Sequence, residues 1–219
     1  MAVSARSAAD LAALAAEQAG IMPFALDVTD LGAVKDVWAR IADELGVPEL
    51  VVLNAGTYVP VSAEGFSAEK FGANVEVNLM GTVKCLEVVM PAMMARRSGH
   101  IAVVSSLTGY VGLPTASAYG ATKAALINMC EALEPELEAF GVKLSVINPG
   151  FVDTPLTRKN TFPMPFLIST EDAVERIAHG LEAGKFEIAF PRRMSVAIRV
   201  LAALPHWARL AVTRRMLPK

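Results

Sequence analysis

Three side chains near the middle of the chain have the types and spacing needed to exchange a proton with an alcohol oxygen. Tyr119 and Lys123 lie four residues apart at the start of a predicted helix, and Ser106 lies thirteen residues before Tyr119 at the end of a predicted strand. A tyrosine has a pKa of about 10, and a nearby lysine ammonium is expected to lower it. Tyr119 can then pass a proton to an oxygen that Ser106 hydrogen-bonds, while Lys123 holds a ribose hydroxyl. This chemistry suits carbonyl–alcohol interconversion with hydride from a nicotinamide.

Two alternatives compete at this site. Taken alone, Tyr119 and Lys123 also fit an ordinary solvated pair on a helix surface. Ser105 adjoins Ser106 and could be the serine instead. The thirteen-residue gap to Tyr119 selects Ser106, and the flanking motifs favour the catalytic interpretation of the pair.

Strand-like and helix-like segments alternate, which predicts an α/β protein with a doubly wound parallel sheet. Short apolar segments predict buried strands at 2–5, 22–26, 49–53, 100–105 and 142–147. Amphipathic segments predict helices at 8–19, 31–45, 68–96, 116–139 and 171–183, with Asp30, Ser67 and Thr170 as N-caps. Ligands bind beyond the carboxyl ends of such strands, where this chain places Asp27-Val28, Asn54-Ala55-Gly56, Ser106 and Asn148-Pro149-Gly150.

The composition indicates one folded domain. The chain has 219 residues, of which 53% are hydrophobic and 19% charged, and its net charge of −2 gives no global attraction to nucleic acid. Cys85 and Cys130 lie in apolar helical patterns without metal-ligand spacing, so we expect neither a disulfide nor a metal site. No uninterrupted apolar run reaches the length of a membrane span, which predicts a soluble cytoplasmic protein.

The chain resembles the short-chain dehydrogenases/reductases, from residue 1 to about residue 190. The resemblance depends on motifs that occur in the family's order: Asn-Ala-Gly at 54–56, NVEVNLMG with Asn78, the Ser106, Tyr119 and Lys123 set, and NPGFVDT at 148–154. Each motif alone is weak, and together they are specific. The resemblance implies a Rossmann-like catalytic domain over residues 1–190, an NAD(P)-dependent oxidoreductase for a secondary alcohol and its ketone or aldehyde, and a homo-oligomer that pairs through helices 68–96 and 116–139.

The resemblance also implies individual roles. Asn78 corresponds to a fourth catalytic residue that holds a proton-relay water near the lysine, although a buried asparagine can also simply satisfy neighbouring backbone groups. The residues expected to touch the cofactor are Asp27 and Val28 beside the adenine, Asn54, Ala55 and Gly56 along its length, Tyr119 and Lys123 at the ribose, and Pro149, Gly150, Val152 and Thr154 around the nicotinamide.

Arg6 bears on the choice of cofactor. In the resembling family, an acid at the end of the second strand grips the ribose hydroxyls of NAD, whereas an arginine just beyond that strand favours the 2′-phosphate of NADP. Here Ala5 is not acidic and Arg6 follows it. The sequence therefore favours NADP(H), with NAD left open.

The chain departs from the family pattern at its amino end. Family members begin with a strand, a glycine-rich turn of the form TGxxxGxG and a helix, and this sequence contains no such turn. Because that turn offers backbone N–H groups to the pyrophosphate, we expect an N-terminally truncated sheet with two exposed strand edges and a weakened cofactor site. Three interpretations stay open: a fragment or misplaced start, which the intact catalytic residues favour; a weak or inactive, cofactor-deficient enzyme; or a non-catalytic interaction subunit.

The segment 155–168 falls where the family has a mobile substrate lid. Phe162, Met164, Phe166 and Leu167 would line an apolar pocket there, which suggests a hydrophobic or bulky carbonyl substrate. The alternative is that these side chains merely pack against the body of the protein.

Residues 191–219 form a predicted basic, amphipathic tail of short helices. No acid follows Glu187, and proline residues divide the segment into short pieces. The pattern favours surface helices packed on the core, with contact to a membrane surface or to another subunit as alternatives. The basic residues are Arg192, Arg193, Arg199, Arg209, Arg214, Arg215 and Lys219.

Overall fold

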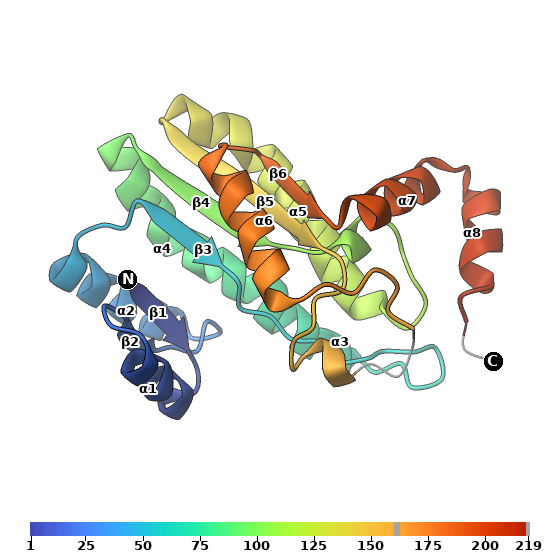
Figure 1. Cartoon of the computed structure of the whole chain (residues 1–219), viewed down its shortest axis with the longest axis horizontal. Helices are drawn as coiled ribbons and strands as arrows, with labels where there is room; N and C mark the ends of the chain where they lie inside the picture. The colour runs from blue at the N-terminus through green and yellow to red at the C-terminus, as the bar shows by residue number, and fades with distance from the viewer. Residues whose placement is uncertain (160–162, 218–219) are drawn as a thin grey trace.

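The strands form two parallel sheets in a computed structural model that describes residues 1–159 and 163–217 (Figure 1). The smaller sheet pairs β1 (Ala2–Ala5) with β2 (Met22–Ala25). The larger sheet has the order β3 (Leu50–Leu53), β4 (Gly99–Val104), β5 (Val142–Pro149) and β6 (Glu187–Phe190). This arrangement confirms the predicted α/β fold with parallel sheets.

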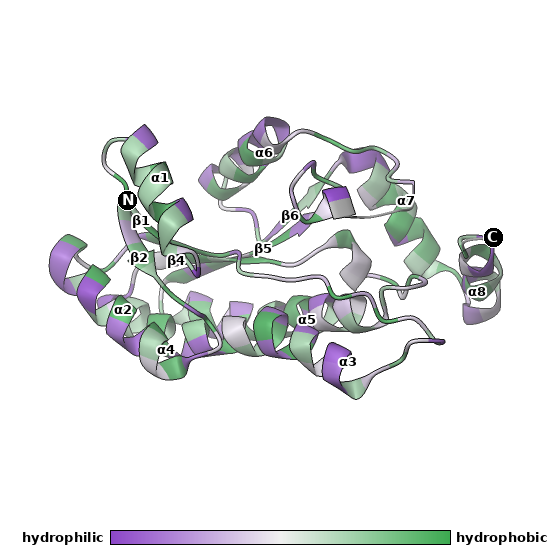
Figure 2. Cartoon of the chain, turned by 90° about the horizontal axis from the view of Figure 1, so that it is seen from below, coloured by the Kyte–Doolittle hydropathy of each residue, from purple (hydrophilic) through white to green (hydrophobic). Residues whose placement is uncertain are grey.

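Helices cover both faces of the sheet, as Figure 2 shows, with α2, α3, α4 and α5 on one side and α1 and α6 on the other. A π-helical segment, Val75–Met80, joins α3 to α4, so the predicted helix 68–96 is continuous but not regular. The helices are α1 (Ala8–Glu17), α2 (Leu31–Leu45), α3 (Ala68–Asn74), α4 (Gly81–Arg96), α5 (Ser117–Ala139), α6 (Thr170–Glu182), α7 (Arg192–Ala203) and α8 (His206–Arg214), with short 3-10 turns at Leu107–Gly109 and Thr157–Lys159.

Two of the three predicted N-caps are confirmed. The side chain of Asp30 accepts a hydrogen bond from Ala33 N, and that of Ser67 accepts one from Lys70 N. The third prediction, Thr170, is wrong because Thr170 is already helical and Ser169 caps α6. The Thr170 hydroxyl instead donates to the backbone oxygen of Asp153.

The core lies on both sides of the two central strands. Ile101 and Val103 of β4 face α4 and α5, where they meet Met93 and Leu126 in one buried cluster. The alternate residues face the other layer, where Ala102 and Ile147 pack with Ile188, Phe190 and Ala173. Because β4 and β5 are buried on both faces, they hold the residues at their carboxyl ends in fixed positions.

The prediction that every strand is buried is wrong for β1, β2 and β3. Each of them has two exposed residues: Ser4 and Ala5, Pro23 and Ala25, and Leu50 and Val52. Among the described residues, β1 pairs with β2 alone and β3 with β4 alone, so β1 and β3 each have an open edge, as expected from the sequence. A strand without neighbours on one side leaves part of its surface in water.

In the described part of the chain, one helical stretch, Ala68–Arg96, is long and apolar enough to cross a membrane. Its inner side carries the fully buried Asn74, Asn78 and Met93. These side chains belong to the interior of the domain, so the stretch is a core helix of this fold.

Candidate active site

The turn that follows β4 presents the Ser106 hydroxyl. Thr108 donates to this oxygen from its backbone N (3.2 Å) and from its Oγ1 (3.0 Å), and Ser106 donates to the Pro149 oxygen at 3.4 Å. The neighbouring Ser105 hydroxyl is buried and donates to the Lys123 carbonyl oxygen at 2.8 Å. Ser105 is therefore committed to the backbone of α5, which leaves Ser106 as the better candidate for the reacting serine.

The Ser106 turn lies directly against the first turns of α5. A Cβ built on Gly109 would lie 2.6 Å from Ile127 Cδ1 and 2.9 Å from the Lys123 backbone oxygen. Both distances are shorter than real carbon contacts, so only glycine permits this approach. The glycine thereby brings Ser106 to the face of α5 that carries Tyr119 and Lys123.

We expect Gly109→Ala to lower both stability and turnover. The added methyl group must push the turn away from backbone atoms of α5, and overpacking of this kind destabilises a protein by about 1–3 kcal/mol. Thermal unfolding and steady-state kinetics measure the two effects. Gly112→Ala is the matched control because a Cβ at Gly112 meets nothing within 4 Å. An unchanged melting temperature and turnover in Gly109→Ala would show that the close approach is unimportant.

Lys123 is a buried cation beside Tyr119. Its side chain is 4% exposed, its Nζ donates to the Val104 oxygen at 2.8 Å, and Nζ lies 5.6 Å from the centroid of the Tyr119 ring. Burial lowers the pKa of Lys123 to about 8. The ammonium is thus still mostly charged at neutral pH and has few neighbours that solvate it.

The expectation that Lys123 lowers the pKa of Tyr119 is not met in this structure. Burial raises the pKa of Tyr119, a hydrogen bond from Ser106 opposes this shift, and the nearby Tyr58 adds to it. Lys123 is not among the causes of this shift, and its ammonium donates to Val104 O. Tyr119 is therefore protonated at neutral pH.

Tyr58 is a site residue that the sequence analysis missed. Its ring packs edge-on against the Tyr119 ring, with centroids 5.4 Å apart and an interplanar angle of 85°. Such T-shaped pairs are favourable and restrict ring orientation. The signal available in the sequence was its position, two residues after the Asn-Ala-Gly motif at the end of β3.

Asn78 is fully buried in the π-helical segment, and its side chain clamps the loop after β3. Its Oδ1 accepts from Thr57 N at 2.7 Å, and its Nδ2 donates to Thr57 O at 3.0 Å and to Thr122 Oγ1 at 3.2 Å. In this structure the Asn78 side chain thus forms hydrogen bonds with neighbouring buried polar groups, as buried asparagines commonly do. Its catalytic role stays a prediction.

Residues expected near the adenine form a second group, after β2. The Asp27 carboxylate accepts from Thr29 N (2.9 Å) and Thr29 Oγ1 (2.8 Å), and these bonds, with the charges of Arg6 and Lys84, lower its pKa. The Val28 side chain lies against α4, where a Cβ on Gly81 would come within 2.6 Å of it. Arg6 and Asp27 are both exposed, and the Arg6 charge is close enough to affect the Asp27 carboxylate.

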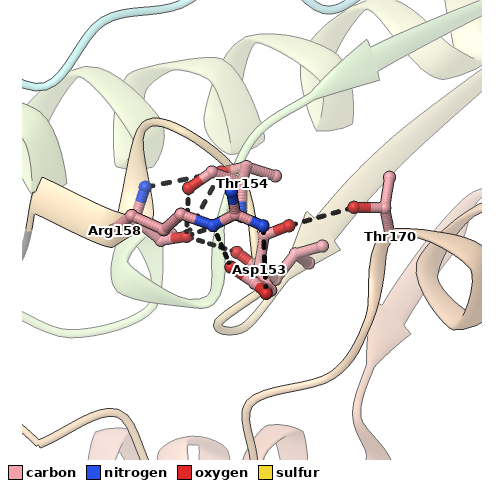
Figure 3. Close-up of polar contacts among 6 residues, drawn as sticks. Asp153, Thr154, Arg158 and Thr170 are labelled. Atoms are coloured by element: carbon pink, nitrogen blue, oxygen red, sulfur yellow. Dashed lines mark hydrogen bonds and ion pairs between the residues drawn. The ribbon is translucent and has the colours of Figure 1, made fainter.

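Residues expected around the nicotinamide follow β5. Gly150 N donates to Phe190 O at 2.7 Å, and Val152 bridges to Ile168. The next residues are held by hydrogen bonds. Arg158 Nε donates to Asp153 Oδ1 at 2.7 Å (Figure 3). Thr154 N donates to Thr157 Oγ1 at 3.0 Å. These bonds fix the backbone of the segment through Thr154, and residues 150–154 are half-buried.

The predicted lid residues are only partly described. Phe162 lies outside the described residues. Met164 is half-buried, and Phe166 and Leu167 are 49% and 43% exposed. These two side chains therefore do not pack fully against the body, which was the alternative to a substrate-lining role.

The residues present fit the nicotinamide end of a dinucleotide. In the described chain the Lys123 ammonium has one hydrogen-bond acceptor, Val104 O, so two of its three N–H groups remain for a ribose hydroxyl. A Cβ on Gly56 would lie 3.8 Å from Lys123 Nζ and 3.5 Å from Asn78 Oδ1. The exposed backbone of 54–56 consequently runs beside the ammonium, where the sequence analysis placed the cofactor.

Comparison with known proteins adds independent information. A family model described as short chain dehydrogenase matches residues 1–163. An uncharacterized oxidoreductase of Myxococcus xanthus is 38% identical over 203 residues, which cover 92% of this chain and 80% of that protein. The 3-oxoacyl-[acyl-carrier-protein] reductase FabG of Thermotoga maritima is 33% identical over 137 residues, or 63% of this chain and 56% of the reductase. A short chain dehydrogenase of Burkholderia cenocepacia, solved in complex with NADP, superimposes with a TM-score of 0.81 at 27% identity and covers 99% of this chain and 85% of its own.

Proposed function

The chain belongs to the short-chain dehydrogenase family and is an oxidoreductase acting on CH–OH groups, and from this premise we propose that it interconverts a secondary alcohol and its ketone, or a primary alcohol and its aldehyde, with NADP(H) as the preferred cofactor. The observation that carries the proposal is the closeness of the Ser106 hydroxyl to the Tyr119 phenol, whose pKa it affects, next to the buried Lys123 ammonium. A proton donor, a second hydrogen-bond donor and a cation converge there on one small volume.

Each residue has a distinct part in the proposed reaction. The bound nicotinamide supplies or accepts the hydride. Ser106 hydrogen-bonds the substrate oxygen and orients the reacting carbon. Tyr119 is protonated at neutral pH because burial raises its pKa, so it is ready to donate a proton to the oxygen of a carbonyl substrate. In the reverse direction the same phenol must first lose its proton, and alcohol oxidation should therefore be faster at higher pH.

The substrate side of the proposal is apolar. Phe166 and Leu167 are each nearly half exposed in the segment between β5 and α6, and Met164 is half-buried there. Exposed apolar side chains at the mouth of a site favour a hydrophobic or bulky carbonyl compound. We further propose a cytoplasmic homo-oligomer whose copies pair through α4 and α5, as the family resemblance implies.

Titration of the chain with NADPH and NADH, followed by the fluorescence of the reduced nicotinamide, tests the proposal. We expect both nucleotides to bind, with NADPH the tighter. Turnover of NADPH with a panel of apolar ketones then tests the reaction. If neither nucleotide binds, the chain is not a cofactor-dependent enzyme and a non-catalytic interaction protein becomes the better description.

Arg6→Ala is expected to weaken NADPH binding about tenfold or more and to leave NADH binding nearly unchanged. The 2′-phosphate of NADPH would lose its charge-assisted hydrogen bonds to the Arg6 guanidinium, each worth about 1.5–3 kcal/mol. The same fluorescence titration measures both dissociation constants. Arg40→Ala is the matched control. Arg40 is also an exposed arginine, but it belongs to α2 and its guanidinium lies over the ring of Phe24 in β2. Equal losses for NADPH and NADH in Arg6→Ala would contradict a phosphate-specific role.

A further inference from the structure

Helix α8 turns its apolar side away from the protein. Thr213 is its buried residue, and Ala208 and Arg209 are half-buried, whereas Trp207 is 77% exposed and Leu210 49% exposed. Trp207, Leu210, Ala211 and Arg214 follow the spacing i, i+3, i+4, i+7 and so share one outward face. A surface helix of a soluble domain normally has the opposite orientation, with its apolar stripe on the core.

Helix α7, which precedes it, packs in the ordinary way. Met194, Ile198 and Leu201 are buried in a cluster with Leu107 and Val111, next to the Ser106 turn. The prediction of surface helices packed on the core therefore describes α7 well and α8 poorly. Figures 1 and 2 both show α8 at the end of the molecule, beyond α7.

The charge around the outward face of α8 is uniformly positive. Arg214 lies on that face and Arg215 follows directly, and no acid occurs in the sequence after Glu187. Of the arginines in α7 and α8, Arg199 is the one with an ion pair within the described chain, to Glu187. Arg214 and Arg215 thus place two positive charges, without ion pairs in the described chain, next to the exposed side chains of Trp207 and Leu210.

We propose that the outward face of α8 binds the surface of an anionic lipid bilayer. Trp207 and Leu210 would enter the boundary between headgroups and acyl chains, where tryptophan is preferred, and Arg214 and Arg215 would contact lipid phosphates. The helix lies on the bilayer and does not cross it, because it has nine residues.

A second copy of the chain is a poorer occupant of this face. A two-fold contact brings the same patch of both copies together, so Arg214 and Arg215 of both copies would lie in one interface. The segment after Glu187 holds no acid to neutralise them. Like charges placed together across an interface oppose association, whereas an anionic bilayer attracts all of them.

Co-sedimentation of the full chain with lipid vesicles tests the proposal. We expect binding to vesicles of phosphatidylglycerol and phosphatidylcholine in equal parts, weak binding to pure phosphatidylcholine, and a loss of binding at high salt. Trp207→Gln/Leu210→Gln and Arg214→Glu/Arg215→Glu should each lower the partition coefficient at least about tenfold. In a Trp38→Phe background the Trp207 emission should shift to shorter wavelength when anionic vesicles are added.

The control is Val174→Gln/Arg176→Glu on α6, which likewise removes one exposed apolar side chain and reverses one exposed arginine. This variant should bind vesicles as the unaltered chain does, and its loss of binding would overturn the assignment to α8. The proposal is also overturned if the unaltered chain binds no anionic vesicle. A third result would also contradict the proposal. If the unaltered chain is an oligomer in sedimentation velocity, binds no lipid, and dissociates when Trp207→Gln/Leu210→Gln is introduced, then α8 is a contact between copies. None of these outcomes bears on the proposed enzymatic function, which the nucleotide titration tests separately.

Discussion

Tyr119→Phe is expected to lower kcat for carbonyl reduction by about 10²–10⁴-fold, the range for loss of a general acid. The variant keeps the ring that packs against Tyr58 and removes only the hydroxyl, which lies close to Ser106. The dissociation constant for NADPH should stay nearly unchanged, because Lys123 and the loop after β3 are untouched. Stopped-flow oxidation of bound NADPH separates the chemical step from binding.

Tyr110→Phe is the matched control for this experiment. Burial raises the pKa of Tyr110 to about 12, and the pKa of Tyr119 is raised for the same reason. The Tyr110 hydroxyl, however, is bonded to Glu187 and accepts from Asn148 Nδ2 at 3.0 Å, so its hydrogen-bond partners in the described chain are remote in sequence from the Tyr119 and Lys123 pair. A shifted pKa alone therefore does not single out the proton donor, and Tyr110→Phe should retain most of the turnover. Full turnover in Tyr119→Phe would show that another group donates the proton.

The order and type of the elements followed from the sequence because each local pattern agrees with the tertiary structure. The apolar segment 100–105 corresponds to β4, whose residues are buried on both faces, and the amphipathic segment 31–45 corresponds to α2 with Asp30 as its cap. Burial of the outer strands could not be read in the same way. Val3 and Val52 have the residue types of buried strands, but exposure depends on whether another strand pairs with the edge, which is a property of the assembled sheet.

Residue types and spacing also predicted that Ser106, Tyr119 and Lys123 lie together, and the structure places them close to one another. Their electrostatics could not be predicted. Spacing placed Lys123 near Tyr119, but the direction of the ammonium depends on the Val104 carbonyl at the end of β4, which accepts its hydrogen bond. Likewise, the composition of 191–219 predicted amphipathic helices, but not which side of α8 would face the body, because helical periodicity defines a stripe and not its neighbour.

Lys123→Met is expected to stabilise the folded protein at pH 7 and to reduce its activity. Burial lowers the pKa of Lys123 from 10.5 to about 8. The unfolded chain therefore binds this proton more tightly, and at pH 7 the folded protein carries a buried ammonium at a cost of about 3 kcal/mol. Methionine removes that cost but leaves the Val104 oxygen without its donor, which offsets about 1–2 kcal/mol. The net expected gain in the free energy of unfolding at pH 7 is about 1–2 kcal/mol.

The pH dependence gives this prediction its sign. Between about pH 8 and pH 10.5 the folded protein has lost the proton while the unfolded chain retains it, so the stability contributed by Lys123 rises with pH across this window. Urea unfolding at pH 7 and pH 10 should show the advantage of Lys123→Met shrinking or reversing at the higher pH. Lys70 is exposed, so Lys70→Met is the control and should show no such change.

The buried Lys123 ammonium is also the donor available to a ribose hydroxyl. Lys123→Met should therefore weaken NADPH binding and lower turnover even though the fold becomes more stable, as expected when a functional group is held in an unfavourable environment. A variant no more stable than the unaltered chain at pH 7, with the same pH dependence, would show that the Lys123 charge is solvated in the folded protein.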